Sequence, residues 1–315
     1  MSIVLGVAAS HTTLMNTHWD AVAHLDGAVG FRDALAHVNE MLVAAQPDVV
    51  VIVGPNHFRG LWLDLMPAFL IGVGSVDAAG EHGTPKGPLL GDPAFAHSML
   101  EALVDDEFDI AFSAALTIDH GITHAVQYML SDVPAPIVPV LVNAFAPPLP
   151  RLARCVAFGR ALGRALAATD RRVALIASGG LSHALAFPDW RSPANADEEF
   201  LVTSWLEGRG RWEEFEARRR GIVVGGAPRL APEFDRAFLD AAEQGALEQW
   251  AAEPNRDRTL PLEAGNGGNE VRTWLILAAA CGHAPVRVLS YAPVPEWKTG
   301  MAVAVVEAPR NGDEP

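Results

Sequence analysis

Residues 48–60, DVVVIVGPNHFRG, contain the pattern that decides the fold. Residues 49–53 are an unbroken run of β-branched apolar side chains, which is typical of a strand buried on both faces of an α/β sheet. The run ends at Gly54 and Pro55, and His57 follows shortly after. Because ligands of open α/β sheets bind beyond the carboxyl ends of strands, this histidine is predicted to lie where a site forms.

The same arrangement occurs twice more in the chain. The apolar run 3–9 is followed by His11, and the run 173–177 is followed by His183. One histidine after a strand says little, because a loop histidine often serves only as a hydrogen-bonding group. Three histidines after three buried strands predict one shared site at the carboxyl edge of the sheet.

The remaining segments alternate between strand and helix patterns. Further strands are predicted at residues 68–73, 108–113, 137–142, 286–291 and 301–306. Helices are predicted at 31–45, 94–103, 152–168 and 270–281, in a short segment ending at 130, and through much of 189–250. Between them, residues 81–93 are rich in Gly and Pro and predict a long, functional loop. This alternation predicts an α/β fold with helices on both faces of a central mixed sheet. We expect a single domain over residues 1–315, with 309–315 as a flexible tail.

The composition limits the class of protein. The formal net charge of -15 argues against nucleic acid and an anionic membrane surface as partners. No apolar stretch is long enough to span a bilayer, and the first residues lack the basic region of a signal peptide. Cys155 and Cys281 are too few for a disulfide framework and lack metal-finger spacing. We therefore expect a soluble, cytoplasmic protein.

Three residues are candidate metal ligands. His11 lies in ASHTT, His57 in PNHFRG, and Glu270 in GNGGNEVRTW, where the glycines would let the backbone pack closely under a metal. The alternative for the last motif is that Asn269 caps a helix and Glu270 complements the helix dipole. Two histidines and one carboxylate are the facial set that holds Fe(II) and leaves coordination positions open. A catecholate could occupy two of these positions and O2 a third.

Two further histidines are candidates for acid and base chemistry. His120 follows Asp119, although neighbouring side chains on an extended segment point to opposite faces, and the alternative is an exposed turn. His183 ends the segment SGGLSH, which lacks the G-x-S-x-G elbow of α/β hydrolases and suits a general base or a structural loop. The three consecutive arginines at 218–220 are interpreted as a solvated helix face.

Taken in chain order, the motifs ASHTT, GPNHF, DHGIT, SGGLSH, GNGGNEVRTW and the late PEW resemble the LigB superfamily of class III extradiol dioxygenases. The resemblance extends from about residue 3 to residue 307. Carried over by motif, the family's iron ligands fall on His11, His57 and Glu270, and its catalytic residues fall on His183, His120 and Asp119. The resemblance thus implies an Fe(II) enzyme with a LigB-like α/β fold, usually assembled as a homo-oligomer.

The resemblance also implies an activity. Such an enzyme inserts both atoms of O2 into a catecholic ring, here a 2,3-dihydroxyphenylpropionate-like or related catechol, and opens the ring by meta cleavage. His183 would take the proton of the second hydroxyl as a general base. His120, tuned by Asp119, would then donate a proton as the ring opens. Neither a flavin nor an external reductant is expected.

Other interpretations remain open at the level of sequence. The loop 83–91, GTPKGPLLG, is more like that of dioxygenases acting on gallate or its methyl ether, and residues 189–255 match the family least. Arg59, Lys86 and Arg272 are candidates for holding a substrate carboxylate. A metal-dependent hydrolase with the same ligands would consume no O2. A non-catalytic binding module would have lost at least one of the six candidate residues.

Overall fold

The computed structural model describes residues 2–307, and the tail expected at 309–315 lies outside them. The described residues contain one nine-stranded sheet. Its strands are β1 (Ile3–Ala9), β2 (Val49–Pro55), β3 (Phe69–Ala79), β4 (Lys86–Leu89), β5 (Ala111–Ile118), β6 (Ile137–Val142), β7 (Val173–Ser178), β8 (Arg287–Val294) and β9 (Thr299–Glu307).

Helices and short 3-10 turns connect these strands. The helices are α1 (Leu14–Thr17), α2 (Asp26–Ala45), α3 (Pro93–Asp105), α4 (His120–Met129), α5 (Leu152–Ala167), α6 (Ala196–Glu207), α7 (Glu213–Gly225), α8 (Pro232–Glu243), α9 (Leu247–Ala252), α10 (Arg256–Glu263) and α11 (Val271–Ala280). The turns are η1 (Asn266–Glu270), directly before α11, and η2 (Pro295–Trp297), directly before β9.

The centre of the sheet is four parallel strands in the order β6-β2-β7-β1. Every residue of β2, β6 and β7 is buried, as expected for parallel strands covered on both faces. β3 pairs antiparallel with β6 at one side of this centre, and β9 pairs antiparallel with β1 at the other. The sheet is therefore mixed, as predicted, and the carboxyl ends of β1, β7 and β2 lie side by side.

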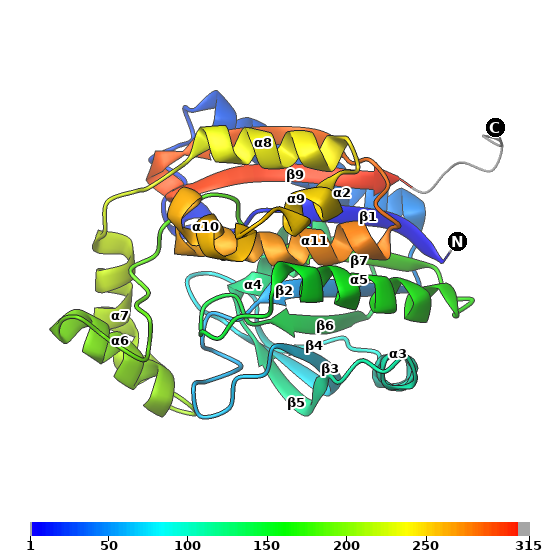
Figure 1. Ribbon diagram of the computed structural model, residues 1–315, viewed down its shortest axis with the longest axis horizontal. Coiled ribbons are helices and arrows are strands. Elements are labelled where there is room, and N and C mark those ends of the chain that lie inside the picture. The colour runs from blue at the N-terminus through cyan, green and yellow to red at the C-terminus, as the bar shows by residue number, and fades with distance from the viewer. Residues whose placement is uncertain (1, 308–315) are drawn as a thin grey trace.

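Helices cover both faces of the sheet. α2 and α4 pack on one face, and α5 and α11 pack on the other (Figure 1). The sequence of α2 explains its orientation, because Phe31, Leu35, Val38 and Leu42 recur at helical spacing and all are buried. α5 and α11 approach closely at Gly163, where an added Cβ would lie 2.6 Å from the carbonyl oxygen of Ala280.

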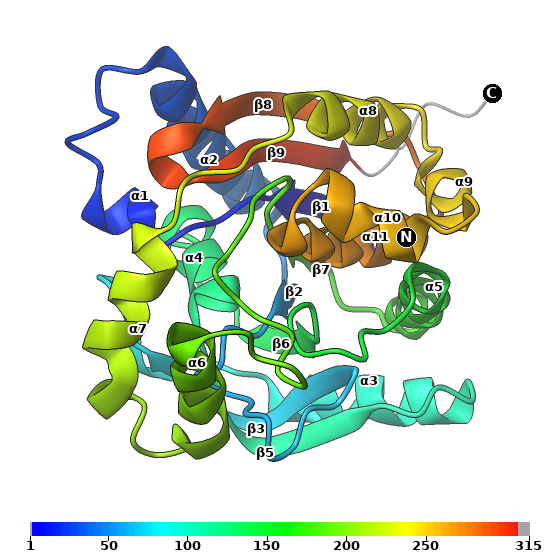
Figure 2. The same ribbon diagram turned by 60° about the vertical axis from the view of Figure 1, so that its left-hand side comes forward.

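α6 and α7 lie apart from these layers, beyond the carboxyl ends of the central strands (Figures 1 and 2). A small separate core holds α6 in place, and in it the rings of Phe58 and Trp205 stack with centroids 4.4 Å apart. α7 contributes little to any core, since Arg219 is its one buried residue. These two helices therefore form a wall over the edge of the sheet where a site was predicted.

Most predicted elements are confirmed, with differences at β3, β4 and β5. β3 continues to Ala79, six residues beyond the predicted end at residue 73. The predicted loop 81–93 contains β4, which pairs antiparallel with β3. The turn between them uses Gly80 and Gly83 at positive φ, and Pro88 is tolerated because β4 is an edge strand. β5 begins at Ala111 and not at residue 108, because Phe108 is buried in the helical core beside Phe158.

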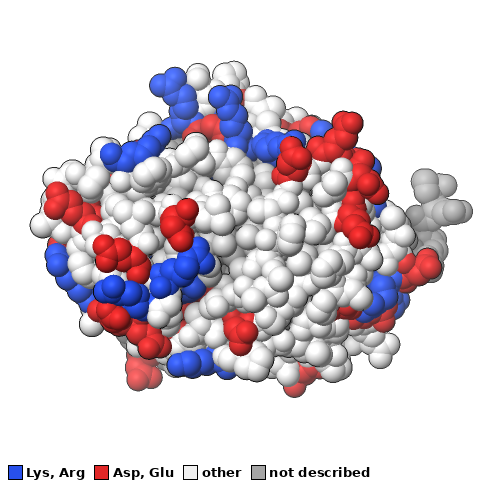
Figure 3. All heavy atoms as spheres, turned by 90° about the horizontal axis from the view of Figure 1, so that it is seen from below, with Lys and Arg blue, Asp and Glu red and all other residues white. Residues whose placement is uncertain are grey.

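The outer surface carries charge unevenly. On the face seen in Figure 3, charged side chains lie along the top and right-hand edges and in a mixed acidic and basic cluster on the left, with a broad uncharged area between them. Within residues 2–307, no helix combines the length and the apolar character needed to cross a membrane.

Candidate functional site

The three histidines after strands lie together at the carboxyl edge of the sheet. His11 follows β1, His57 follows β2, and His183 follows β7, which lies between those two strands. All three residues are buried, with exposed fractions of 4%, 4% and 5%. Because β1, β7 and β2 are neighbouring parallel strands, their ends bring together residues up to 172 positions apart, from 11 to 183.

Glu270 is the centre of this group. Its carboxylate lies 3.1 Å from His57 Nε2, 3.8 Å from His11 Nε2 and 4.0 Å from His183 Nε2. It also accepts a hydrogen bond from the backbone N–H of Gly180. Glu270 ends η1, and its side chain is 1% exposed. Asn269 does not cap the helix, because its Oδ1 accepts from Arg272.

Each of the three histidines is fixed through its other ring nitrogen. His11 Nδ1 lies 2.9 Å from the hydroxyl of Ser178, and His183 Nδ1 donates to the carbonyl of Leu181 at 3.0 Å. His57 Nδ1 donates to Asp119 at 3.2 Å. Such contacts orient histidine ligands and leave Nε2 free for a metal. His11 Nε2 is buried and has no hydrogen-bond partner among the described residues, as expected of an atom made for a metal bond.

Glycines allow this close packing. An added Cβ at Gly180 would lie 2.9 Å from the His183 ring, and one at Gly267 would overlap the same ring. An added Cβ at Gly179 would lie 2.8 Å from the carbonyl oxygen of Glu270. The glycines of SGGLSH and GNGGNE therefore let two loops meet around His183 and Glu270.

The protonation states favour a bound cation. Burial lowers the pKa of His11 to about 4, so its ring is neutral at pH 7. Burial alone would raise the pKa of Glu270, but His11 and the hydrogen bond from His57 outweigh burial and lower it to about 2. Burial would also lower the pKa of His57, yet Asp119 and Glu270 raise it to about 10. In the absence of a metal, the buried carboxylates of Asp119 and Glu270 thus keep a proton on His57. A bound metal ion would balance the same negative charge in place of that proton.

The sequence left open whether Asp119 contacts His120, and the structure places the Asp119 carboxylate against His57. It caps α4, where it accepts from the backbone N–H of Gly121 at 3.0 Å, and it also accepts from the backbone N–H of His57 at 2.5 Å. A capping side chain turns back toward its own helix, and here the carboxylate meets the backbone and the ring of His57. Within the described residues its hydrogen-bond partners are these groups and His57 Nδ1. Asp119 therefore orients a candidate ligand instead of contacting His120.

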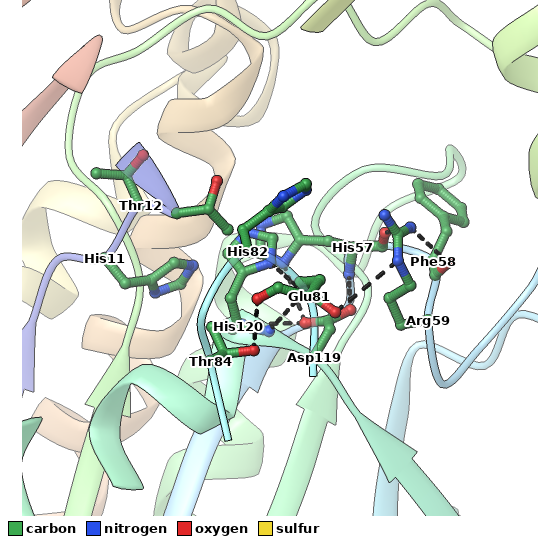
Figure 4. A network of polar contacts seen from close by, with 12 residues as sticks. His11, Thr12, His57, Phe58, Arg59, Glu81, His82, Thr84, Asp119 and His120 are labelled. Carbon is green, nitrogen blue, oxygen red and sulfur yellow. Dashed lines mark hydrogen bonds and ion pairs between the residues drawn. The ribbon is translucent and has the colours of Figure 1, made fainter. Parts of the chain in front are cut away.

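Glu81 takes the place expected of Asp119. Its Oε1 lies 2.6 Å from His120 Nδ1 and accepts from the backbone N–H of His120 at 2.9 Å (Figure 4). Burial and the neighbouring Asp119 raise the pKa of Glu81 to about 7, whereas burial and then His57 lower the pKa of His120 well below its usual value. The sequence prediction missed Glu81, although it had marked the loop in which Glu81 lies as functional.

His120 is also close to the candidate ligands. Its ring stacks on the His57 ring with centroids 3.9 Å apart and an angle of 28° between the planes (Figure 4). One nitrogen each from His11, His57 and His120 lie within 4.8 Å of one another, and so do donor atoms of Glu81, Asp119 and His120. The geometry thus offers more than one group of possible metal ligands.

A cavity opens beside these residues. Its lining combines apolar side chains with a few polar and charged groups, as is typical of small-molecule sites. His11, His57, His120, His183 and Glu270 line one side. Apolar side chains of Leu185, Phe187, Val223 and Trp297 line others, and α7 forms the outer wall with Glu216, Arg219 and Arg220.

Of the three cations that the sequence suggested for a substrate carboxylate, only Arg59 lines the cavity. Its guanidinium is paired with Glu216 and stacks on Trp212 at 4.4 Å. Arg272 is buried outside the cavity, where it donates to Pro150 O and Asn269. Lys86 is exposed on β4 and lies 3.9 Å from Glu213.

The three arginines at 218–220 do not form one solvated face, so that interpretation was wrong. Arg218 is exposed, but Arg219 is buried and donates to the carbonyl of His57 at 2.6 Å. Arg220 is half-buried and lines the cavity. The reason is the position of α7, which turns two of its three consecutive arginines toward the site.

The comparisons with known proteins agree with this geometry. A family model described as the catalytic LigB subunit of aromatic ring-opening dioxygenase matches residues 6–302. The chain therefore belongs to the LigB family of metal-dependent, ring-opening dioxygenases. It is an extradiol ring-cleaving dioxygenase, as the resemblance had implied, and the hydrolase alternative is not favoured.

Several curated relatives carry a more specific name. An enzyme of Rhodococcus jostii named 2,3-dihydroxyphenylpropionate/2,3-dihydroxicinnamic acid 1,2-dioxygenase is 33% identical, over 95% of this chain and 96% of its own. Enzymes of the same name from Mycolicibacterium vanbaalenii and Paraburkholderia xenovorans are 34% and 33% identical, each over 93% of this chain and 94% of its own. A crystal structure of an uncharacterized Escherichia coli protein aligns with a TM-score of 0.49 at 13% identity, over 96% of this chain and 99% of that one. We draw no conclusion from a similarity at this level.

Proposed function

We propose that the chain is an Fe(II) enzyme that cleaves a catechol bearing a short acidic side chain, with iron held by His11, His57 and Glu270. The observation that carries the proposal is the shared orientation of three histidines. Each Nδ1 is engaged by Ser178, Asp119 or Leu181, and each Nε2 lies within 4.0 Å of the Glu270 carboxylate. Two histidines and one carboxylate suit iron with open positions for substrate and O2.

Glu270 is favoured over His120 as the third ligand. A metal lies in the plane of each imidazole ring that binds it. The His120 ring is stacked on the His57 ring with centroids 3.9 Å apart, so a metal in the plane of His57 lies outside the plane of His120. His120 Nδ1 is also taken up by Glu81 at 2.6 Å. Glu270 supplies negative charge, which stabilises a divalent ion in a buried site. We therefore assign His120 to proton transfer.

Bound Fe(II) would bring the two catechol oxygens and O2 together and transfer electron density from the ring to O2. The protein's own contribution begins with His183. Its Nδ1–H donates to the carbonyl of Leu181, so the neutral ring presents a free lone pair at Nε2. That atom faces the same space as Glu270 and is placed to remove a proton from a substrate hydroxyl.

His120 and Glu81 supply the acid. Glu81, with its pKa raised to about 7, holds a proton near neutral pH and lies against His120 Nδ1. When His120 gives its Nε2 proton to the substrate, the proton on Glu81 moves to Nδ1 and restores a neutral ring. In this proposal Asp119 acts on His57 and fixes the direction of its Nε2.

The substrate class follows from the relatives and the cavity. The names of the relatives specify catechols with a three-carbon acidic side chain. The cavity here has apolar walls suited to a ring and side chains of Arg59, Arg219 and Arg220 at its outer wall. A basic group in a chain of net charge -15 favours an anionic substituent.

The test is oxygen uptake by protein loaded with Fe(II) under anaerobic conditions. The panel contains 3-(2,3-dihydroxyphenyl)propionate, protocatechuate, gallate and 3-O-methylgallate. We expect one O2 consumed per molecule of the first compound and a yellow product that contains both atoms of ¹⁸O2. Uptake with gallate alone would contradict the substrate class, and hydrolysis of esters without uptake would contradict the oxygenase.

We also propose that the enzyme assembles as a homo-oligomer in the cytoplasm. Large apolar side chains that remain exposed, among them Phe112 and Val104 at 62% and 57%, would be covered by an interface between copies. The two cysteines, which are unpaired, support a reducing compartment. Light scattering after size exclusion tests the assembly, and a mass of 33.5 kDa at micromolar concentration would contradict it.

A further inference from the structure

Several positively charged side chains line the cavity, and most are already engaged. Arg59 is paired with Glu216, and Arg219 donates to His57 O and lies 3.7 Å from Glu216. The amine of Lys298 donates to the carbonyls of Val224 and Gly226 and so caps the end of α7. These three cations hold α7 against the site.

Arg220 is different. Its guanidinium donates to the hydroxyl of Thr13 at 2.5 Å and to the hydroxyl of Thr17 at 2.9 Å. Both partners are neutral, and no carboxylate forms an ion pair with Arg220 among the described residues. Burial lowers the pKa of Arg220, although the side chain stays charged at neutral pH, and it lines the cavity.

We propose that Arg220 forms the subsite for the carboxylate on the substrate's side chain. The inference rests on the proposed function and adds a specificity-determining residue to it. A half-buried guanidinium with neutral partners offers strong, charge-assisted hydrogen bonds to a carboxylate. The hydroxyl of Thr13 can donate to the same carboxylate, since a hydroxyl both accepts and donates.

The position of Arg220 relative to the iron ligands fits a short side chain. Thr13 lies two residues after His11, and two residues span at most about 7 Å. Because His11, Thr13 and Arg220 line the same cavity, and Arg220 donates to Thr13, a catechol held at His11 can direct its substituent toward Arg220. Phe187, Val223 and Trp297 supply apolar surface for the ring and the methylene groups.

The nearby acids do not cancel this subsite. Glu216 and Glu81 act on Arg220 at longer range. Glu216 is itself balanced by Arg59 and Arg219 and contacts His82 at 2.7 Å. With its pKa raised to about 7, Glu81 carries only part of a charge near neutral pH. The charge left unmatched at this end of the cavity is that of Arg220.

The experiment compares two substrates that differ in the terminal group of the side chain, a carboxylate in 3-(2,3-dihydroxyphenyl)propionate and a methyl group in 3-propylcatechol. For each, kcat/KM is measured with the wild type, Arg220→Met and Arg220→Lys. The selectivity ratio is kcat/KM for the propionate divided by kcat/KM for 3-propylcatechol. We expect Arg220→Met to lower this ratio by roughly 10- to 100-fold, mostly through a higher KM for the propionate. Arg220→Lys should restore part of the ratio. Equal losses on both substrates, or no change in the ratio, would overturn the proposal.

Two further measurements separate the possible causes of a negative result. Arg218→Met, an exposed neighbour on α7 that pairs with Asp197, should leave the ratio unchanged. Cleavage of 3-propylcatechol by the wild type tests the dioxygenase independently of Arg220. If Arg220→Met does not fold, anaerobic binding of 3-phenylpropionate and 3-phenylpropan-1-ol to the wild-type holoenzyme still decides the matter. Tighter binding of the acid supports the subsite, and equal binding overturns it.

Discussion

The two sides of the cavity are built in different ways. The inner side consists of strand ends and loops, and its residues His11, His57 and Glu270 are at most 4% exposed. The outer side is α7, in which one residue is buried and charged contacts replace a core. Arg59, Glu216 and Arg219 form those contacts. The inner side is positioned by the fold itself, and the outer side by a few polar bonds.

This difference separates two tasks. A metal site needs ligands held to a fraction of an ångström, and a parallel sheet covered on both faces supplies that rigidity. Selection of a substituent needs a surface that can vary without disturbing the metal, and a peripheral helix supplies it. We therefore expect substitutions on the inner side to abolish chemistry and substitutions on the outer side to change selectivity and stability.

The largest effect is expected for a ligand. His57→Ala should lower the iron content to background and abolish turnover, because the site loses a donor and leaves Glu270 and Asp119 unbalanced. Iron analysis after anaerobic loading checks this. The exposed His97 on α3 provides the control, His97→Ala, which should bind iron as the wild type does. Full iron occupancy in His57→Ala would refute the ligand set.

A smaller loss is expected at the base. His183→Gln should retain iron, while kcat falls roughly 100- to 10,000-fold, the usual contribution of a general base. Single-turnover kinetics with anaerobically bound substrate separates this loss from weaker binding. Normal turnover by the variant would show that the base lies elsewhere.

Asp119→Asn distinguishes orientation of a ligand from proton transfer. Because Asp119 contacts His57 Nδ1, the variant should bind iron roughly 10- to 100-fold more weakly, with kcat nearly restored when iron is saturating. Titration with Fe(II) measures the affinity. A reduced kcat at saturating iron, with unchanged affinity, would return Asp119 to the acid role.

The pH dependence of stability should reveal Glu81. Its folded pKa of about 7 lies above the ordinary value of 4.5, so folding binds its proton more tightly. The stability that comes from this group is complete below pH 4.5 and declines as the pH rises through 7. In metal-free protein, the free energy of unfolding of Glu81→Gln should therefore rise relative to that of the wild type as the pH increases from 5 to 8. Denaturant unfolding at several pH values measures this difference. If the free energies of unfolding of the variant and the wild type changed equally with pH, the prediction would be contradicted.

The smallest effect concerns the outer side. Glu216→Gln removes a half-buried carboxylate bound to Arg59 and His82, and it should lower Tm by a few degrees without loss of iron. Arg209→Gln, which breaks an exposed ion pair with Asp64, should change Tm by less than about one degree. Similar shifts for both variants would mean that the Glu216 contacts do not hold α7.

The sequence predicted the inner side better than the outer side. Runs of apolar residues locate β1, β2, β6 and β7, and a parallel sheet brings strand ends together whatever the intervening sequence. That rule was enough to group His11, His57 and His183. Glu270 required the resemblance of its motif, because its position depends on a glycine loop packing against SGGLSH.

The contacts of α7 follow no such local rule. The arginines at 218–220 are adjacent in sequence, and only the docking of α7 decides which of them faces the cavity. The partner of His120 was missed for a related reason, since Glu81 is 39 residues away and reaches it through the turn between β3 and β4. Long-range polar contacts between loops leave no periodicity in the sequence.

The most direct test of the account is the position of the iron. Anomalous diffraction at the iron edge, from crystals loaded anaerobically with Fe(II), would locate it without reference to activity. We predict one peak at roughly 2.0–2.2 Å from His11 Nε2, His57 Nε2 and a Glu270 oxygen, with His183 and His120 unbound. A peak bound by His120, or one held by Glu81 and Asp119, would contradict the account.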